Sequence, residues 1–162
     1  MIKFLKFMII SLLFFTSTSC SDETQSVAEN SASKLTISAA TNTELRQTYT
    51  IEIADTKEKL YNGLMGRTSL DENTGLLFDI SIVPQDVDIA FWMKDTLIPL
   101  DVIFIDEDGT IFFIYENAQP NDTTPIFPPK RPRAVLEVNG GQVAQYGIRV
   151  DDIVTAEMFK NK

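Results

Sequence analysis

The chain has 162 residues, of which 44% are hydrophobic, and a formal net charge of −9 at pH 7. This length and hydrophobic content favour one folded domain with a core of its own over two domains or a disordered chain. The acidic balance argues against nucleic acid as a partner, because phosphate binding needs a basic surface. The sequence contains no His, which excludes Ser-His-Asp and Cys-His catalysis, His proton shuttles and the usual catalytic zinc sites.

The N-terminal segment has the layout of a secretory signal peptide. Lys3 and Lys6 precede an apolar run at residues 7–15, and small residues follow as far as Cys20, the single cysteine. The run is about ten residues, too short for the roughly 20 that a membrane-spanning helix needs. The segment resembles a bacterial lipoprotein signal, in which the cysteine is lipidated and becomes the new N-terminus.

The sequence leaves alternatives open for the processing of this segment. Ser17 stands where lipoprotein signals usually have Leu, so ordinary cleavage after Ser19 and an uncleaved anchor remain alternatives. We expect a signal peptide at residues 1–20, a flexible polar tether at 21–33 and a single β-rich domain at 34–162. The protein would then be exported and held on the cell envelope by a lipid, with the membrane as its first partner.

The domain begins with two short stretches of strand-like alternation, at residues 34–39 and 47–54. Asp55 and Glu58 then have the spacing of a capping box. They predict a short helix that ends near Gly66.

Downstream, short alternating or apolar stretches between turn signals predict mainly strands. Asp108 and Gly109 supply the positive-φ positions of a tight hairpin turn. Residues 120–132 hold five of the seven prolines and predict an ordered surface loop or a mobile lid. Residues 142–146 could form one or two helical turns. The predicted strands are residues 75–79, 87–94, 100–106, 110–116, 134–138 and 153–158.

Many short strands with one or two short helices favour a mainly-β fold over a βαβ fold. We expect a single β-sandwich or a partly closed barrel.

Several motifs occur in a specific order along the domain. They are GLMGR (63–67), GLLF (75–78), FWMKDTLIPLDVIFID (91–106), VLEVNGG (135–141) and GIRVDD (147–152). Their order and spacing resemble the domain of unknown function 192 family, small bacterial and archaeal proteins that are often exported. The resemblance covers residues 35–159 and implies a jelly-roll-like β architecture. The chain departs from it at Asp151, where most members have Gly at the first position of the turn.

The motif around Trp92 contains candidate binding residues. Trp92 lies on the less apolar side of its segment, followed by Lys94 and Asp95, and an aromatic ring with a polar rim is a common platform for sugars or flat ligands. The alternative is that Trp92 fills core space and Lys94 neutralises Asp95. Arg67 could bind a ligand carboxylate or pair with an acid of the sheet, or it could form a structural ion pair.

Asp101 and Glu137 interrupt apolar strands. A buried carboxylate is costly unless it is paired or hydrogen-bonded, so Asp101 should have a partner, either Lys94, Arg67 or backbone N–H groups. The two acids are also candidates for a general acid/base pair of the kind that glycosidases use. Structural roles for such acids are more common than catalytic ones.

The sequence predicts neither a cofactor nor a metal site. Residues 106–109 begin like a calcium loop, but the remaining ligands of an EF-hand are missing. The lack of a recognisable nucleophile favours a binding module over an enzyme. The expected ligand is a glycan, an envelope polymer or a partner protein, recognised around Arg67, Trp92, Lys94, Asp95 and Asp101. The alternatives are a small carboxylate-dependent hydrolase or lyase acting on an envelope substrate, and a structural role without a ligand.

Overall fold

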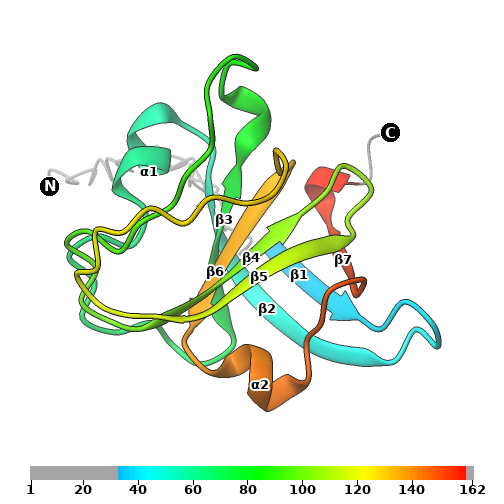
Figure 1. Ribbon diagram of the computed structural model, residues 1–162. Coiled ribbons are helices and arrows are strands. Elements are labelled where there is room, and N and C mark those ends of the chain that lie inside the picture. Colours follow the sequence, from blue (N-terminus) through cyan, green and yellow to red (C-terminus); the bar gives the residue numbers. More distant parts are fainter. Residues whose placement is uncertain (1–32, 160–162) are drawn as a thin grey trace, which may run out of the picture. The chain divides into compact units, whose positions relative to one another are not determined.

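The computed structural model describes residues 33–159 (Figure 1). The expected signal peptide at residues 1–20, with its lipidated Cys20, lies outside the described residues, as does the expected tether up to residue 32. The first strand begins at Ser33. Among residues 33–159, no helix is long and apolar enough to cross a membrane.

Residues 33–159 form one seven-stranded sheet in the order β5-β4-β6-β3-β2-β1-β7. All neighbouring pairs are antiparallel except β2 and β3, which are parallel. The mainly-β expectation is therefore confirmed. The strands are β1 (Ser33–Ser38), β2 (Leu45–Ala54), β3 (Thr74–Asp79), β4 (Leu100–Ile105), β5 (Ile111–Ala118), β6 (Ala134–Asn139) and β7 (Ile153–Ala156).

The sheet curls until its two edge strands, β5 and β7, approach each other, as in a half-barrel (Figure 1). Thr110 forms an isolated bridge with Ile153. The backbone N–H of Ile111 donates to the carbonyl of Asp152 at 2.9 Å, and that of Asp151 donates to the carbonyl of Ile111 at 2.8 Å. Of the two architectures that the sequence left open, the partly closed barrel is the one observed.

Each face of the sheet packs against its own apolar core. The core on the first face includes Leu35, Tyr49, Ile103 and Leu136. The core on the second includes Leu64, Phe78, Met93, Val102 and Phe104. The alternation of strand side chains therefore decides which core each residue joins. The same alternation decides where the two interior acids lie.

Both predicted short helices are present, as α1 (Lys57–Asn62) and α2 (Gln142–Tyr146). The predicted cap of α1 is wrong by one residue. The N-cap is Thr56, whose hydroxyl accepts from the N–H of Lys59 at 3.3 Å. Asp55 instead accepts from the ammonium of Lys59 at 2.8 Å, because a side chain outside the helix cannot reach the free N–H groups of the first turn. Short 3₁₀ turns occur at Ile80–Ile82 and Glu157–Phe159.

The prediction of a strand at residues 87–94 is wrong, because this segment does not pair with the sheet. The segment forms a single isolated bridge, in which the N–H of Phe91 donates to Ile126 at 3.0 Å and that of Ile126 donates to Phe91 at 2.7 Å. The alternation of burial survives, since Met93 is buried while Trp92 and Lys94 are exposed. Its partner is the proline-rich loop, whose five prolines lack the N–H groups that a longer ladder needs.

The proline-rich loop is anchored to the segment that carries Trp92. Besides the bridge at Ile126, Asp122 accepts from the N–H of Met93 at 2.8 Å, and Asn121 donates to the carbonyl of Thr96 at 3.0 Å. These contacts are those of an ordered surface loop rather than of a mobile lid.

Candidate functional site

A pocket of about 170 Å³ opens between α1, the loop after it and the segment that carries Trp92. We call it the Glu137 pocket. Its wall includes residues from four parts of the chain, among them Gly63, Leu64, Phe78, Phe91, Trp92 and Glu137. The volume is comparable to that of an engineered apolar cavity of about 150 Å³ that holds benzene. The pocket can therefore accept a group about the size of one ring.

Glu137 supplies the pocket with a buried carboxyl group. It lies on β6 opposite Leu76 of β3 and Val102 of β4, and only 5% of it is exposed. Within residues 33–159, neither a hydrogen bond nor an ion pair reaches its side chain. Burial raises the pKa of Glu137 from 4.5 to about 8, because desolvation disfavours the charged form. A carboxyl group that is protonated at neutral pH therefore lines the pocket.

Gly63 shapes the wall beside this carboxyl group. It ends α1 with φ +46° and ψ −126°, a backbone conformation that residues with a Cβ rarely adopt. A Cβ placed there would lie 3.2 Å from the ring of Phe78 and 4.0 Å from Oε2 of Glu137. The first glycine of GLMGR thus keeps the pocket open and ends α1, whereas the sequence predicted the helix end near Gly66.

A backbone hydrogen bond joins the GLMGR loop to the turn after Trp92. The N–H of Gly66 donates to the carbonyl of Asp95 at 2.8 Å, and that of Thr96 donates to the carbonyl of Met93 at 3.1 Å. Asp95 has φ +55°, which short polar side chains tolerate better than other non-glycine residues. The positive φ explains why an Asp occurs at position 95. Its side chain is exposed and is not part of the pocket wall.

Trp92 lies on the rim of the pocket and is 43% exposed. The ammonium of Lys94 lies 5.9 Å from the centroid of its ring, within the range of a cation–π contact. The ammonium of Lys94 thus lies by the indole, and no ion pair between Lys94 and Asp95 is found among the described residues.

Arg131 holds the opposite wall of the pocket in place. Its guanidinium donates to the carbonyls of Val83 and Val87, each at 2.8 Å, and more distantly to that of Ile80 at 3.5 Å. No sequence pattern indicates this role of Arg131, because the acceptors are backbone groups 44 or more positions away in the chain. Phe78 and Phe91 were likewise missed, since nothing separates a pocket phenylalanine from a core one in an apolar stretch.

Asp101 lies outside the pocket wall and is completely buried. One carboxylate oxygen accepts from the N–H of Asn117 at 2.8 Å, and the other accepts from the N–H of Val143 at 2.8 Å. Val143 belongs to the first turn of α2, whose own N-cap residue, Gly141, offers no side-chain acceptor. Of the partners expected for Asp101, backbone N–H groups are the ones observed, and the carboxylate caps a helix from a distant strand.

The two interior acids do not share a cleft. Asp101 pairs with Val138, whereas Glu137 pairs with Val102. Directly paired residues project to one face of a sheet, and successive residues project to opposite faces. The carboxyl groups of Asp101 and Glu137 therefore lie on opposite faces, and the arrangement does not bring these two candidates together as an acid/base pair.

Arg67 forms an ion pair at the surface. One of its terminal nitrogens donates to both carboxylate oxygens of Glu52, at 2.9 Å and 2.6 Å. The side chains of Arg67 and Glu52 are 39% and 60% exposed. Asp101 and Glu137 are not its partners, and Arg67 is not part of the pocket wall.

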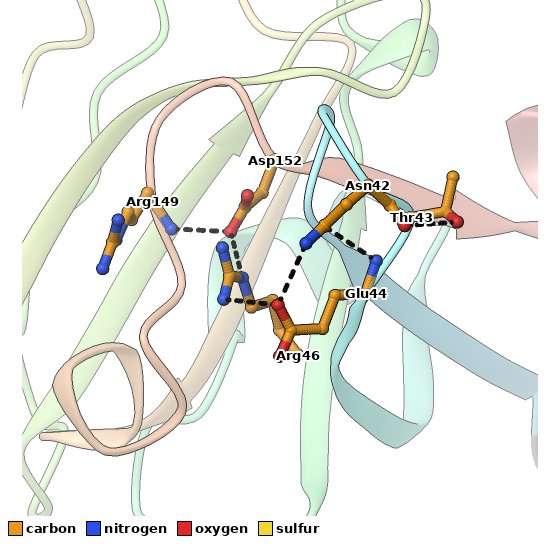
Figure 2. A network of polar contacts seen from close by, with 6 residues as sticks. All are labelled: Asn42, Thr43, Glu44, Arg46, Arg149 and Asp152. Atoms are coloured by element: carbon orange, nitrogen blue, oxygen red, sulfur yellow. Dashed lines mark hydrogen bonds and ion pairs between the residues drawn. The ribbon is translucent and has the colours of Figure 1, made fainter.

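A separate polar network closes the turn of the GIRVDD motif (Figure 2). The carboxylate of Asp152 accepts from Nε of Arg46 at 3.3 Å and from the N–H of Arg149 at 2.9 Å. Its neighbour Asp151 has φ +75°, the conformation that the expected Gly would adopt without strain. The network joins the start of β2 to the turn before β7.

The described residues contain no group of three or more acidic or thiol side chains that could hold a metal ion. The chemistry that the pocket offers is therefore that of two carboxyl groups, the buried one of Glu137 and the exposed one of Asp88, beside aromatic rings. Fold and site together define a small half-barrel protein of mainly-β structure, with one ring-sized pocket that a buried glutamate lines.

Known proteins share the sequence pattern and the fold of the chain. The sequence profile of the DUF192 family, described as "Uncharacterized ACR, COG1430", matches residues 37–156. The chain belongs to this family. No match was found among curated proteins.

Two solved structures are similar to the chain. One is a protein of unknown function from Novosphingobium aromaticivorans DSM 12444, with 34% identity, a TM-score of 0.68, and coverage of 75% of this chain and 83% of that one. The other is a proposed transcription regulator from Sinorhizobium meliloti 1021, with 31% identity, a TM-score of 0.70, and coverage of 76% of this chain and 92% of that one.

Proposed function

We propose that the protein is a lipid-anchored binding module of the cell envelope and that the Glu137 pocket takes one ring-sized unit of a glycan or envelope polymer. The observation that carries this proposal is the carboxyl group of Glu137, which is buried, has no partner among residues 33–159 and lies in one pocket with the exposed ring of Trp92. Burial of a carboxyl group without a hydrogen-bond partner lowers stability, because nothing offsets its desolvation. A ligand would satisfy it, which gives the cost a functional reason.

The pocket suits a sugar ring better than a flat protein surface. It is concave and combines apolar side chains with a few polar groups, the usual composition of a small-molecule site. Trp92 can stack on the apolar face of a sugar while Glu137 donates a hydrogen bond to a hydroxyl or carbonyl oxygen. A partner protein that inserts one side chain is the alternative ligand.

Trp92 is the single tryptophan of the chain, so its fluorescence reports on the pocket directly. We expect titration of the full-length protein in detergent with envelope oligosaccharides to change the emission and raise the melting temperature. Trp92→Ala should abolish the thermal shift. Tyr115→Ala is the matched control, because Tyr115 is an aromatic residue of similar exposure, 40%, outside the pocket wall. Equal thermal shifts in both variants would refute the proposal.

The lipid anchor is tested separately. We expect the wild-type protein to incorporate a radiolabelled fatty acid and to sediment with membranes. Cys20→Ala should abolish the label and release the protein from the membrane fraction. Labelling that persists in Cys20→Ala would refute lipidation at this residue.

A second function is favoured by the pKa of Glu137, which burial raises to about 8. A carboxyl group that titrates near the working pH is suited to general acid or base catalysis, so a hydrolase or lyase with Glu137 alone as its acid/base group is the competing proposal. Incubation with envelope oligosaccharides separates the two. Product formation that Glu137→Gln abolishes would favour the enzyme, and binding without turnover would favour the module.

A further inference from the structure

The charged residues of the pocket wall all carry the same sign. Among the described residues, Asp88 and Glu137 contribute the ionisable acids, and neither Lys nor Arg lines the pocket. Outside the wall, Arg67 pairs with Glu52 and Arg131 is bound to backbone carbonyls, while the ammonium of Lys94 lies by Trp92 at the rim. An anionic ligand would therefore meet two acids in the wall, with neither Lys nor Arg among the described residues that line it. A cationic ligand would meet a buried acid without a partner.

The aromatic rings of the pocket wall add a second attraction for cations. Phe78 and Phe91 pack edge to face with centroids 5.0 Å apart, and Trp92 lies at the rim. The faces of aromatic rings carry partial negative charge and bind ammonium groups. The indole of Trp92 already attracts one ammonium, that of Lys94.

We infer that the Glu137 pocket binds the ammonium group of an amine-bearing ligand of about one ring in size, with Glu137 as its counter-ion and Trp92 as its aromatic wall. The inference rests on the proposed binding function and names the chemical class of the ligand. Within a glycan or envelope polymer, the matching unit is a sugar with a free amino group. A neutral sugar can accept a hydrogen bond from protonated Glu137, but it supplies no counter-charge for the carboxylate.

Binding of such a ligand is coupled to a proton. Below pH 8, Glu137 is mostly protonated in the free protein, because burial raises its pKa to about 8. An adjacent ammonium favours the carboxylate, so the carboxyl O–H bond breaks, the proton leaves to solvent and the ion pair forms. The other titratable groups of the pocket wall are Asp88 and Tyr61. The residues that flank Glu137 on β3 and β4, Leu76 and Val102, do not titrate.

The linkage fixes the sign of the pH dependence. As pH rises towards 8, the affinity for the cation should increase by up to about tenfold per pH unit, because each unit corresponds to a factor of ten in the protonation equilibrium. Above pH 8 the affinity should level off. The ligand must keep a fixed charge for this dependence to be read cleanly. Benzyltrimethylammonium meets this requirement, and benzyl alcohol is its neutral counterpart.

The test is calorimetric titration of the full-length protein with these two probes at pH 6.5 and pH 8.5, in buffers of different ionisation enthalpy. We expect the cation to bind about tenfold or more tightly than the alcohol at pH 8.5. Nearly one proton should be released at pH 6.5 and far less at pH 8.5. Glucosamine and N-acetylglucosamine form a second pair that tests the amino group on a sugar.

Variants assign the effect to the pocket. Glu137→Gln should abolish both the preference for the cation and the proton release, and Trp92→Phe should weaken cation binding while proton release persists. Glu58→Gln is the matched control, because Glu58 is an exposed acid of α1 outside the pocket wall, and it should behave as the wild type. Circular dichroism of each variant confirms that it is folded.

The outcomes separate the two proposals. Equal binding of the cation and the alcohol, with dependence on Trp92, would overturn the ammonium inference and leave the binding pocket standing. Cation binding that persists in Glu137→Gln would also overturn the inference. If neither probe pair binds, the inference fails, and the oligosaccharide titration decides on the binding function by itself.

Discussion

Asp101 and Glu137 project from opposite faces of one sheet, although they lie on neighbouring strands. The pairing register of β4 and β6 places Asp101 opposite Val138 and Glu137 opposite Val102. Asp101 satisfies two backbone N–H groups, one of them in α2. Glu137 has no partner among the described residues and faces a pocket. One acid thus stabilises the fold, while the other lowers its stability at a site where a ligand can compensate.

The destabilisation caused by ionisation of buried Glu137 should depend on pH. Its pKa is about 8 in the folded protein, against an ordinary value of 4.5, so the folded state binds more protons than the unfolded state between these values. The free energy of unfolding is therefore not reduced by ionisation of Glu137 below about pH 4.5, and it falls as pH rises from there to about 8. The loss is on the order of 5 kcal/mol.

Glu137→Gln removes this titration. Urea denaturation from pH 5 to pH 8.5 should show the stability of Glu137→Gln, relative to the wild type, increasing by several kcal/mol with pH. Glu58→Gln should run parallel to the wild type, because Glu58 is exposed. Parallel curves for Glu137→Gln and the wild type would show that the carboxyl group is already ionised at neutral pH.

These two acids also show how far the sequence alone could predict the site. An acid within an apolar run is visible in the sequence, and both were identified in this way. Their different roles depend on strand register, since a shift of one residue exchanges the faces. The backbone partners of Asp101 lie 16 and 42 positions away in the chain, and no local pattern marks them.

The segment around Trp92 shows the opposite limit. Its alternation correctly separates buried Met93 from exposed Trp92 and Lys94. The same alternation wrongly predicted a strand at residues 87–94, because periodicity reports burial and not the availability of a hydrogen-bonding neighbour. The proline-rich loop beside it forms an isolated β-bridge at Ile126 and no strand.

Replacement of Asp101 should destabilise the fold without changing the pocket. Hydrogen bonds to a charged group contribute about 1.5–3 kcal/mol each, so we expect Asp101→Ala to lower the free energy of unfolding by about 3–5 kcal/mol. Asp101→Asn retains one acceptor and should lose less. Urea denaturation measures both, and the probe affinity of the folded variants should equal that of the wild type. A loss below about 1 kcal/mol would contradict the capping role.

Asp151 is a position where a substitution should increase stability. Its φ of +75° costs about 1–2 kcal/mol for most non-glycine residues and less for Asp. Asp151→Gly removes this cost but adds freedom to the unfolded chain. We therefore expect a net gain of about 0.5–1 kcal/mol, measured as a higher melting temperature. Asp151→Ala should lower stability, and a gain with Ala would show that the side chain, not the backbone, is unfavourable.

Gly63 and Gly66 offer a matched pair that separates backbone strain from pocket shape. Both have positive φ, +46° and +74°, but an added Cβ at Gly63 would lie 3.2 Å from the ring of Phe78, whereas at Gly66 it would meet nothing within 4 Å. Each Gly→Ala variant should lose about 1–2 kcal/mol of stability through its backbone. Only Gly63→Ala should also narrow the pocket beside Glu137.

The measurement is titration of both variants with benzyltrimethylammonium at pH 8.5, followed through the fluorescence of Trp92. We expect Gly63→Ala to weaken binding about tenfold or more, the size of effect that an obstructed apolar contact produces. Gly66→Ala should bind as the wild type at temperatures where it is fully folded. Equal affinities in the two variants would mean that the ligand does not enter beside Gly63, and the carboxyl group of Glu137 would then lie beyond its reach.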